Sequence, residues 1–128
     1  MPLFMLGGYG DRKKKSAKQE VKKMTVITIC GSMKFEKEMK QIAWNLEVRE
    51  GFSVIQCVYN EQGEGISDED QKRLAAAYYR KIDVADAIYV VDIGGYIGQS
   101  VAAEILYAEQ ARKDIIYHSR FAAEKVSI

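Results

Sequence analysis

Segments with the pattern of buried strands alternate along this chain with segments that have one apolar face when wound as helices. Residues 25–30 (TVITIC) and 87–93 (AIYVVDI) are short and almost uninterrupted in apolar character, as strands covered on both faces are. Residues 34–50 repeat apolar side chains every three or four positions and end at Gly51, which predicts an amphipathic helix. The alternation therefore predicts an α/β domain in which helices cover both faces of a parallel sheet.

The same alternation continues through the rest of the chain and completes a three-layer fold of the flavodoxin or Rossmann type. Further strands are expected at residues 52–58 and 114–118, and further helices at 70–85 and 100–113. Right-handed crossovers between successive strands then give a parallel sheet of four to five strands, with the order 2-1-3-4.

Composition sets the start of the domain and narrows the class of partner. Glycine and then lysine dominate before Met24, so we expect a basic N-terminal extension at residues 1–23 and a single domain at 24–128. The 19 Lys and Arg residues nearly balance the 18 Asp and Glu residues, which favours neither a nucleic-acid nor a membrane partner. The apolar start lacks the basic flank and the length of a signal peptide, and we expect a cytoplasmic protein.

Metal-binding residue types are scarce in this chain. Cys30 and Cys57 are too far apart for a CxxC pair, and His118 is the single histidine. Because no ligand set has the spacing of a structural or catalytic site, we expect free thiols, no metal and no cofactor.

Glycine and serine gather where the expected first and third strands end, at residues 31–35 and 92–99. Open α/β sheets bind ligands at the carboxyl ends of their strands, so both loops lie where a ligand should bind. Glycine lets the backbone approach a ligand, and a helix N-terminus offers free N–H groups to an anion. The alternative is that these glycines serve only the turns, since neither loop matches a dinucleotide or P-loop pattern. The expected ligand-binding residues are Gly31, Ser32, Met33, Lys34, Tyr79, Gly98 and Ser100.

Three segments together resemble the nucleoside 2-deoxyribosyltransferase family and the related 2'-deoxynucleoside 5'-phosphate N-hydrolases. They are ICGSMK at residues 29–34, ADAIYVVDI at 85–93 and GQSVAAEILYA at 98–108, in the family's order over roughly residues 25–118. The resemblance implies that Glu104 is a nucleophile that attacks C1' of the sugar, after which a nucleobase or water accepts the sugar. It also implies a homodimer or higher homo-oligomer.

Two acids are the catalytic candidates. A carboxylate at Glu104 can stabilise the positive charge that develops on a sugar as an N-glycosidic bond breaks, and can form a transient ester with it. We expect Glu104 to lie in the first turn of a helix, where the macrodipole keeps it ionised, although acids also favour that position for stability alone. Asp92, after the third strand, can bind a sugar hydroxyl, donate a proton to the leaving base, or cap a turn.

Two positions depart from the family's pattern. Thr28 stands where the family often has a tyrosine that positions the nucleophile, and the family's aspartate before the third strand is missing. Tyr78 or Tyr79 can supply a hydroxyl there, or both can be core or interface aromatics. The expected function is cleavage of an N-glycosidic bond on a nucleoside or nucleotide, by transfer or hydrolysis. The alternatives are a non-catalytic nucleotide-binding or sensing module and a nucleoside-monophosphate phosphoribohydrolase.

Overall fold

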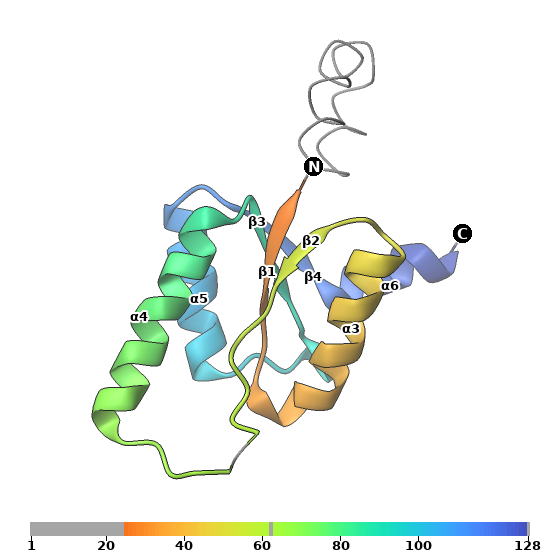
Figure 1. The fold of residues 1–128 in the computed structure, drawn as a ribbon. Coiled ribbons are helices and arrows are strands. Elements are labelled where there is room, and N and C mark those ends of the chain that lie inside the picture. Colours follow the sequence, from red (N-terminus) through yellow and green to blue (C-terminus); the bar gives the residue numbers. More distant parts are fainter. Residues whose placement is uncertain (1–24, 62, 128) are drawn as a thin grey trace, which may run out of the picture.

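Four parallel strands form the middle layer of the domain, in the order β2-β1-β3-β4, as the sequence predicts. The computed structural model describes residues 25–61 and 63–127, so the extension expected at residues 1–23 lies outside the described residues. In the described part, the α/β class and the three-layer arrangement are confirmed (Figure 1). The strands are β1 (Val26–Cys30), β2 (Ser53–Ile55), β3 (Ala87–Val90) and β4 (Asp114–Tyr117).

Helices cover both faces of this sheet. Helices α3 and α6 lie on one face and α4 and α5 lie on the other (Figure 1). Two short 3-10 turns, η1 and η2, follow β1 and β3. The helical elements are η1 (Met33–Phe35), α3 (Glu36–Val48), α4 (Asp68–Val84), η2 (Ile93–Gly95), α5 (Gln99–Gln110) and α6 (His118–Ser127).

The main differences from the sequence-based expectation are two strand ends and one additional helix. The second strand ends at Ile55, so residues 56–58 leave the sheet. The third strand ends at Val90, because the chain turns into η2 soon afterwards. Helix α6 is an element that the sequence did not predict, and it begins directly after β4.

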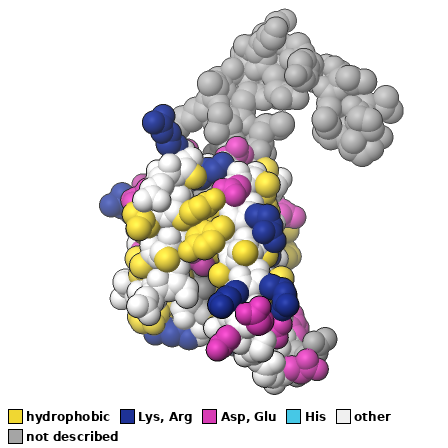
Figure 2. Space-filling view, turned by 90° about the vertical axis from the view of Figure 1, so that its left-hand side faces the viewer, with side chains coloured by type: hydrophobic (Ala, Val, Ile, Leu, Met, Phe, Trp, Pro, Cys, Tyr) yellow, Lys and Arg dark blue, Asp and Glu magenta, His cyan; other side chains and the backbone are white. Residues whose placement is uncertain are grey.

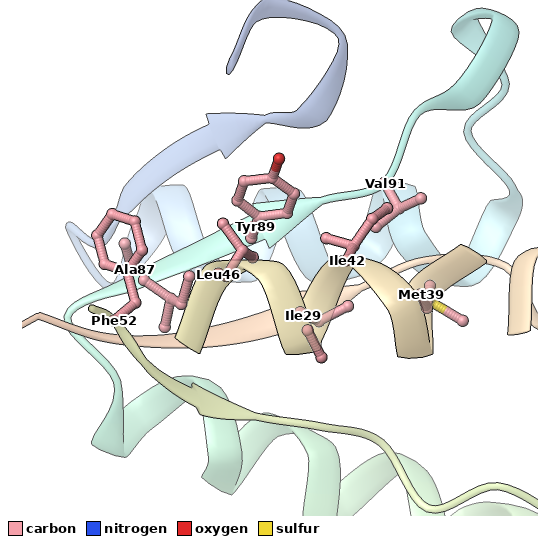
Figure 3. Packing of buried hydrophobic residues seen from close by; sticks show 10 residues of the cluster. Ile29, Met39, Ile42, Leu46, Phe52, Ala87, Tyr89 and Val91 are labelled. Atoms are coloured by element: carbon pink, nitrogen blue, oxygen red, sulfur yellow. The ribbon is translucent and has the colours of Figure 1, made fainter. Parts of the chain in front are cut away.

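The face of the sheet under α3 and α6 is a closed hydrophobic core. Met39, Ile42 and Leu46 of α3 are buried against Ile29 and other side chains of the strands (Figure 3). Each such side chain contributes about 1.5–3 kcal/mol by leaving water. The ring of Phe121 from α6 packs edge to face on Phe52 and Tyr89, with ring centroids 6.3 and 5.7 Å away. Helix α6 therefore seals this side of the sheet.

The other face of the sheet carries the side chains that alternate with these along β1. Thr28 and Cys30 are both fully buried there, because neighbouring positions of a strand point to opposite faces. The Thr28 hydroxyl donates to the Lys81 carbonyl of α4 at 2.9 Å, which gives this buried donor a partner and ties that helix to the sheet. Ile82 of α4 and Val101 of α5 complete the packing. In the described part of the chain, no helix is both long and apolar enough to cross a membrane.

Candidate active site

A cavity of about 660 Å³ lies at the carboxyl edge of the sheet, on the side of α4 and α5. Its lining comes from the loops after β1, β2 and β3 and from both helices, because open α/β sheets bind ligands beyond the carboxyl ends of their strands. The structure brings most of the sequence-predicted site residues to this cavity. They are Gly31, Ser32, Met33, Tyr79, Gly98, Ser100 and Glu104.

Glu104 reaches the cavity from the second turn of α5. The helix begins at Gln99 and has no acid in its first turn, so the expected first-turn position is wrong. The influence of the macrodipole falls off beyond the first turn. Its ionisation is therefore set by what surrounds the carboxyl group.

Burial has the largest effect on the pKa of Glu104. It raises the pKa of the carboxyl from 4.5 to about 7, and an interaction with Cys30 acts in the opposite direction. The expectation of a fully ionised acid at neutral pH is thus replaced by a carboxyl that is close to half ionised there. Among the described residues that line the cavity, Glu104 is the only carboxylic acid.

Cys30 and Tyr78 are the groups whose ionisation is coupled to that of Glu104. The Cys30 thiol interacts with both the Glu104 carboxyl and the Tyr78 hydroxyl. Burial raises the pKa of the thiol and of the hydroxyl above their usual ranges, so both groups keep their protons at neutral pH. Sequence reasoning treated Cys30 only as a free thiol. The signal that could have found it is the period of two in β1, which puts it on the α4 and α5 face just before the Gly31 loop.

The remaining lining is largely apolar, with a few polar groups. Lys81 is the only Lys or Arg among the described lining residues, and its ammonium donates to the Gln56 carbonyl at 3.0 Å. Gly98 precedes α5 without a side-chain hydrogen bond to the helix N-terminus, so the first N–H groups of α5 have no such partner. Apolar contacts come from Met33, Val58, Ile66, Leu74 and the ring of Tyr78, and further polar contacts from Asn60, Gln71, Gln99 and Ser100. Such a lining suits a flat apolar group with polar substituents.

The glycines of the two predicted loops have different structural roles. A Cβ on Gly31 would lie 2.6 Å from the Met39 sulfur, so the β1 loop needs glycine for packing against α3 as well as lining the cavity. Gly94 and Gly95 have φ values of 65° and 81°, which L side chains rarely adopt, and they serve the turn of η2. The alternative that glycines serve only turns therefore fits Gly94 and Gly95 and does not fit Gly31.

Lys34 and Asp92 are the two predicted site residues that do not line the cavity. The Lys34 ammonium lies 3.4 Å from the centroid of the Tyr96 ring, a cation–π contact. The Asp92 carboxylate accepts hydrogen bonds from the Ser119 backbone N–H at 2.8 Å and from the Ser119 hydroxyl at 2.7 Å. Asp92 thus holds the N-terminus of α6 on the opposite face of the sheet, a partner that the sequence did not predict.

The sequence left open whether Tyr78 and Tyr79 supply a hydroxyl to the site or are packed aromatic residues. Both line the cavity and pack against the buried cluster that contains Cys30. The Tyr79 ring packs on Tyr107 with the centroids 4.6 Å apart. Within the described residues, no three His, Cys, Asp or Glu side chains are grouped so that they could hold a metal ion.

Comparisons with known proteins give one distant likeness. No protein-family model and no curated protein matches the chain. Among solved structures, the chain is similar to the CMP N-glycosidase BcmB from Clostridium botulinum, with a TM-score of 0.47 and 19% identity over 72% of this chain and 69% of that one. At this level of similarity we draw no conclusion from the likeness, and we infer the function from the geometry of the site.

Proposed function

We propose that this protein cleaves the N-glycosidic bond of a nucleoside or nucleotide, with Glu104 as the nucleophile. The observation that carries the proposal is the half-buried Glu104 carboxyl, the only carboxylic acid among the described residues of a cavity of about 660 Å³. The cavity lies at the carboxyl edge of the sheet, and its lining includes residues from two of the segments that resemble the deoxyribosyltransferase family.

The reaction uses the ionised form of Glu104. A carboxylate oxygen attacks C1' of the sugar, the C1'–N bond breaks, and the electron pair leaves with the base, which takes up a proton. Negative charge beside C1' stabilises the oxocarbenium-like transition state in a partly dehydrated site. The resulting glycosyl ester is then attacked by water or by a second base, which releases the carboxylate. Activity should therefore rise with pH through the Glu104 pKa of about 7.

The cavity offers separate surroundings for base and sugar. Apolar side chains, including the half-exposed Met33 and the ring of Tyr78, can pack on the faces of a base. Ser32, Ser100 and the N-terminus of α5 can donate hydrogen bonds to hydroxyl or phosphate oxygens. The ligand class is thus a small nucleoside or nucleotide.

A non-catalytic nucleotide-binding module is the second candidate function, and the position of Asp92 favours it. Asp92 is hydrogen-bonded to Ser119 and does not line the cavity, so it does not supply the second acid that would protonate the leaving base. Binding without turnover would use the same cavity and the same apolar walls.

A second copy of the chain is the proposed partner, as the family resemblance implies. Figure 2 shows the face formed by α4 and α5, where hydrophobic side chains gather near the middle between charged ones. Leu74 of α4 and Leu106 of α5 are 43% and 55% exposed. An apolar area of this kind supports self-association and is adjacent to the cavity, because Leu74 also lines it.

Product analysis on the full chain tests these proposals. Nucleosides and their 5'-monophosphates are incubated with the protein, with and without a second base, and released base is measured by chromatography. Free base alone indicates hydrolysis, whereas a new nucleoside indicates transfer. A slow 2'-fluorinated substrate should leave a glycosyl adduct on Glu104, seen by peptide mass spectrometry. Saturable nucleotide binding with no base released from any substrate would reject the enzyme and support the binding module.

A further inference from the structure

We propose that Tyr96 is a specificity-determining residue of the cavity, and that its hydroxyl donates a hydrogen bond to an oxygen atom of the bound nucleoside or nucleotide. Tyr96 lines the cavity and is not among the site residues predicted from the sequence. The class of the ligand rests on the proposed function, whereas the placement of the ring and of its hydroxyl does not.

Contacts with the loop after β1 hold the Tyr96 ring at the rim of the cavity. The Lys34 ammonium lies 3.4 Å from the centroid of this ring. The Phe35 ring meets it edge to face, with the two centroids 6.0 Å apart. Phe35 in turn packs against the buried core under α3. The ring therefore has fixed neighbours although Tyr96 is 44% exposed.

The same contacts join the two loops that the sequence predicts at the site. Lys34 and Phe35 belong to η1, where their backbone N–H groups donate to the hydroxyl and the carbonyl of Ser32 at 3.3 and 2.8 Å. Tyr96 directly follows η2, in the loop that leads to α5 and Glu104. The Tyr96 ring thus ties the loop after β1 to the loop after β3.

The Tyr96 hydroxyl lies beside Gly98, the residue before α5. A Cβ on Gly98 would be 3.5 Å from the hydroxyl oxygen, so a side chain there would occupy the space next to this group. The backbone of Gly98 has φ −76° and ψ 174°, which any residue adopts, and the turn itself does not require glycine. Because both residues line the cavity, the missing side chain leaves room for a ligand atom next to the hydroxyl.

This hydroxyl is not used within the described fold. The hydroxyls of Tyr89 and Tyr107 are hydrogen-bonded to His118 and Asp83, at 2.7 and 2.6 Å. Within residues 25–61 and 63–127, no group is hydrogen-bonded to the Tyr96 hydroxyl. It can therefore donate to an oxygen of the sugar, of the base or of a phosphate group.

Specificity follows from the cost of leaving a polar group without a partner. A ligand with no oxygen near Gly98 displaces water from the Tyr96 hydroxyl without replacing its hydrogen bond, and binds more weakly. Ser32 supplies a hydroxyl to the cavity from the loop after β1, and Ser100 supplies one from the start of α5. Tyr96 adds a hydroxyl from the loop after β3.

The test is the affinity of the full chain for adenosine, uridine and their 5'-monophosphates, measured by calorimetry. Tyr96→Phe keeps the ring and its contacts but removes the hydroxyl, and should weaken binding by about three- to tenfold, the value of one hydrogen bond. The free energy of unfolding should not change, because the hydroxyl has no partner in the described chain. Tyr117→Phe, at the end of β4 and outside the cavity, is the matched control and should bind as the wild type does.

Two further variants test the surroundings of the hydroxyl. Gly98→Ala should weaken binding in the wild-type background but add little in Tyr96→Phe, since both changes remove the same contact. Lys34→Met, measured with the uncharged nucleosides, should weaken binding by about twofold through the loss of the cation from the ring. Lys34→Arg should restore it. Additive losses from Gly98→Ala and Tyr96→Phe would overturn the assignment.

The outcomes separate this proposal from the proposed function. Unchanged affinity of Tyr96→Phe for every probe that the wild type binds overturns the role of the hydroxyl and leaves the proposed function intact. A lower free energy of unfolding in Tyr96→Phe would show that the hydroxyl stabilises the fold, and would overturn the role as well. A loss confined to the monophosphates assigns the hydroxyl to the phosphate group, and an equal loss with the nucleosides assigns it to the sugar or base.

Weaker binding by Tyr96→Phe without base release from any probe supports the role of the hydroxyl and rejects only the enzyme. If the wild type binds none of the four probes, the ligand class is wrong and both proposals are rejected.

Discussion

The two faces of the sheet differ in how completely side chains fill the space between the strands and the helices. Under α3 and α6, apolar and aromatic side chains fill the space (Figure 3). Asp92 is hydrogen-bonded to Ser119 at the start of α6. Under α4 and α5, the packing stops short of the carboxyl edge and leaves a cavity with Glu104, Cys57 and Tyr78 in its lining. The alternation along β1 thus separates a face that is closed by packing from a face that keeps a cavity.

The two acids of these faces illustrate the difference. Asp92 is almost fully buried, and its two oxygens accept hydrogen bonds from Ser119. Glu104 is half-buried, and its pKa is raised to about 7 because burial outweighs the help of Cys30. A raised pKa in a cavity is characteristic of a functional carboxyl, whereas a carboxylate with two donors of its own is characteristic of a structural one.

The largest expected effect is the loss of turnover in Glu104→Gln. The amide keeps the size of the side chain but cannot form the glycosyl ester or stabilise the oxocarbenium-like centre, so base release should fall by roughly 10³-fold or more. Nucleotide binding, followed by calorimetry, should persist. Glu109→Gln on the exposed part of the same helix is the matched control and should keep wild-type turnover. Near-wild-type turnover in Glu104→Gln would reject the nucleophile.

The next largest effect is a loss of stability when the core under α3 is truncated. Leu46 is 2% exposed in the core under α3, and Leu46→Ala should lower the free energy of unfolding by about 2–4 kcal/mol through lost burial and a cavity. Urea unfolding measures this change. Base release per folded molecule should stay within a few-fold of the wild type, because Leu46 does not line the cavity. A collapse of turnover in the folded variant would show that the two faces are coupled.

A smaller effect is the pH dependence of stability caused by Glu104. Its folded pKa of about 7 is raised above the ordinary 4.5, so the folded state binds this proton more tightly. The contribution to stability is fully present below pH 4.5 and is lost as the pH rises through 7. Relative to the wild type, Glu104→Gln should therefore gain on the order of 2 kcal/mol between pH 4.5 and pH 8, after allowance for partial exposure.

Urea unfolding at a series of pH values measures this gain. The difference between Glu104→Gln and the wild type should grow as the pH rises, and Glu109→Gln should show no such trend. A first-turn acid stabilised by the helix macrodipole would give the opposite sign, with the variant less stable at high pH. That result would also contradict the raised pKa.

The fold could be predicted because its signals are local. Uninterrupted apolar runs such as residues 87–90 and the helical period of residues 36–48 each specify an element, and handedness then limits the order of the strands. Helix α6 was missed because it follows β4 without any turn residues between them. The role of its apolar ring, Phe121, is visible only in the folded structure, where the ring packs on Tyr89.

The candidate site could be predicted in part, because loops after adjacent parallel strands must meet at one edge. That rule brought Gly31, Gly98 and Glu104 together. It could not separate Asp92 from them, since the partner of Asp92 is Ser119 in an unpredicted helix. Nor could it give the ionisation of Glu104, which depends on burial in the folded chain and on an opposing interaction with Cys30, far away in the sequence.

The smallest expected effect tests Asp92 as a structural acid. Asp92→Asn keeps one oxygen acceptor for the Ser119 backbone N–H but removes the charge and turns the other acceptor into a donor, so the charge-assisted hydrogen bond from the Ser119 hydroxyl is lost and that hydroxyl can only accept from the amide. The free energy of unfolding should fall by about 1 kcal/mol, the usual value for a helix N-terminal cap or one hydrogen bond. Hydrogen exchange should show that the opening is confined to α6.

Measurement of turnover distinguishes a structural role of Asp92 from a catalytic one. Because the Asp92 carboxylate is directed at α6 and does not line the cavity, base release in Asp92→Asn should stay within a few-fold of the wild type at every pH. Ser119→Ala is the matched control, since it removes the same hydroxyl contact and leaves the carboxylate in place. If Asp92→Asn lost turnover by orders of magnitude while Ser119→Ala did not, Asp92 would have to turn toward the cavity during the reaction, and the separation of the two faces would fail at this residue.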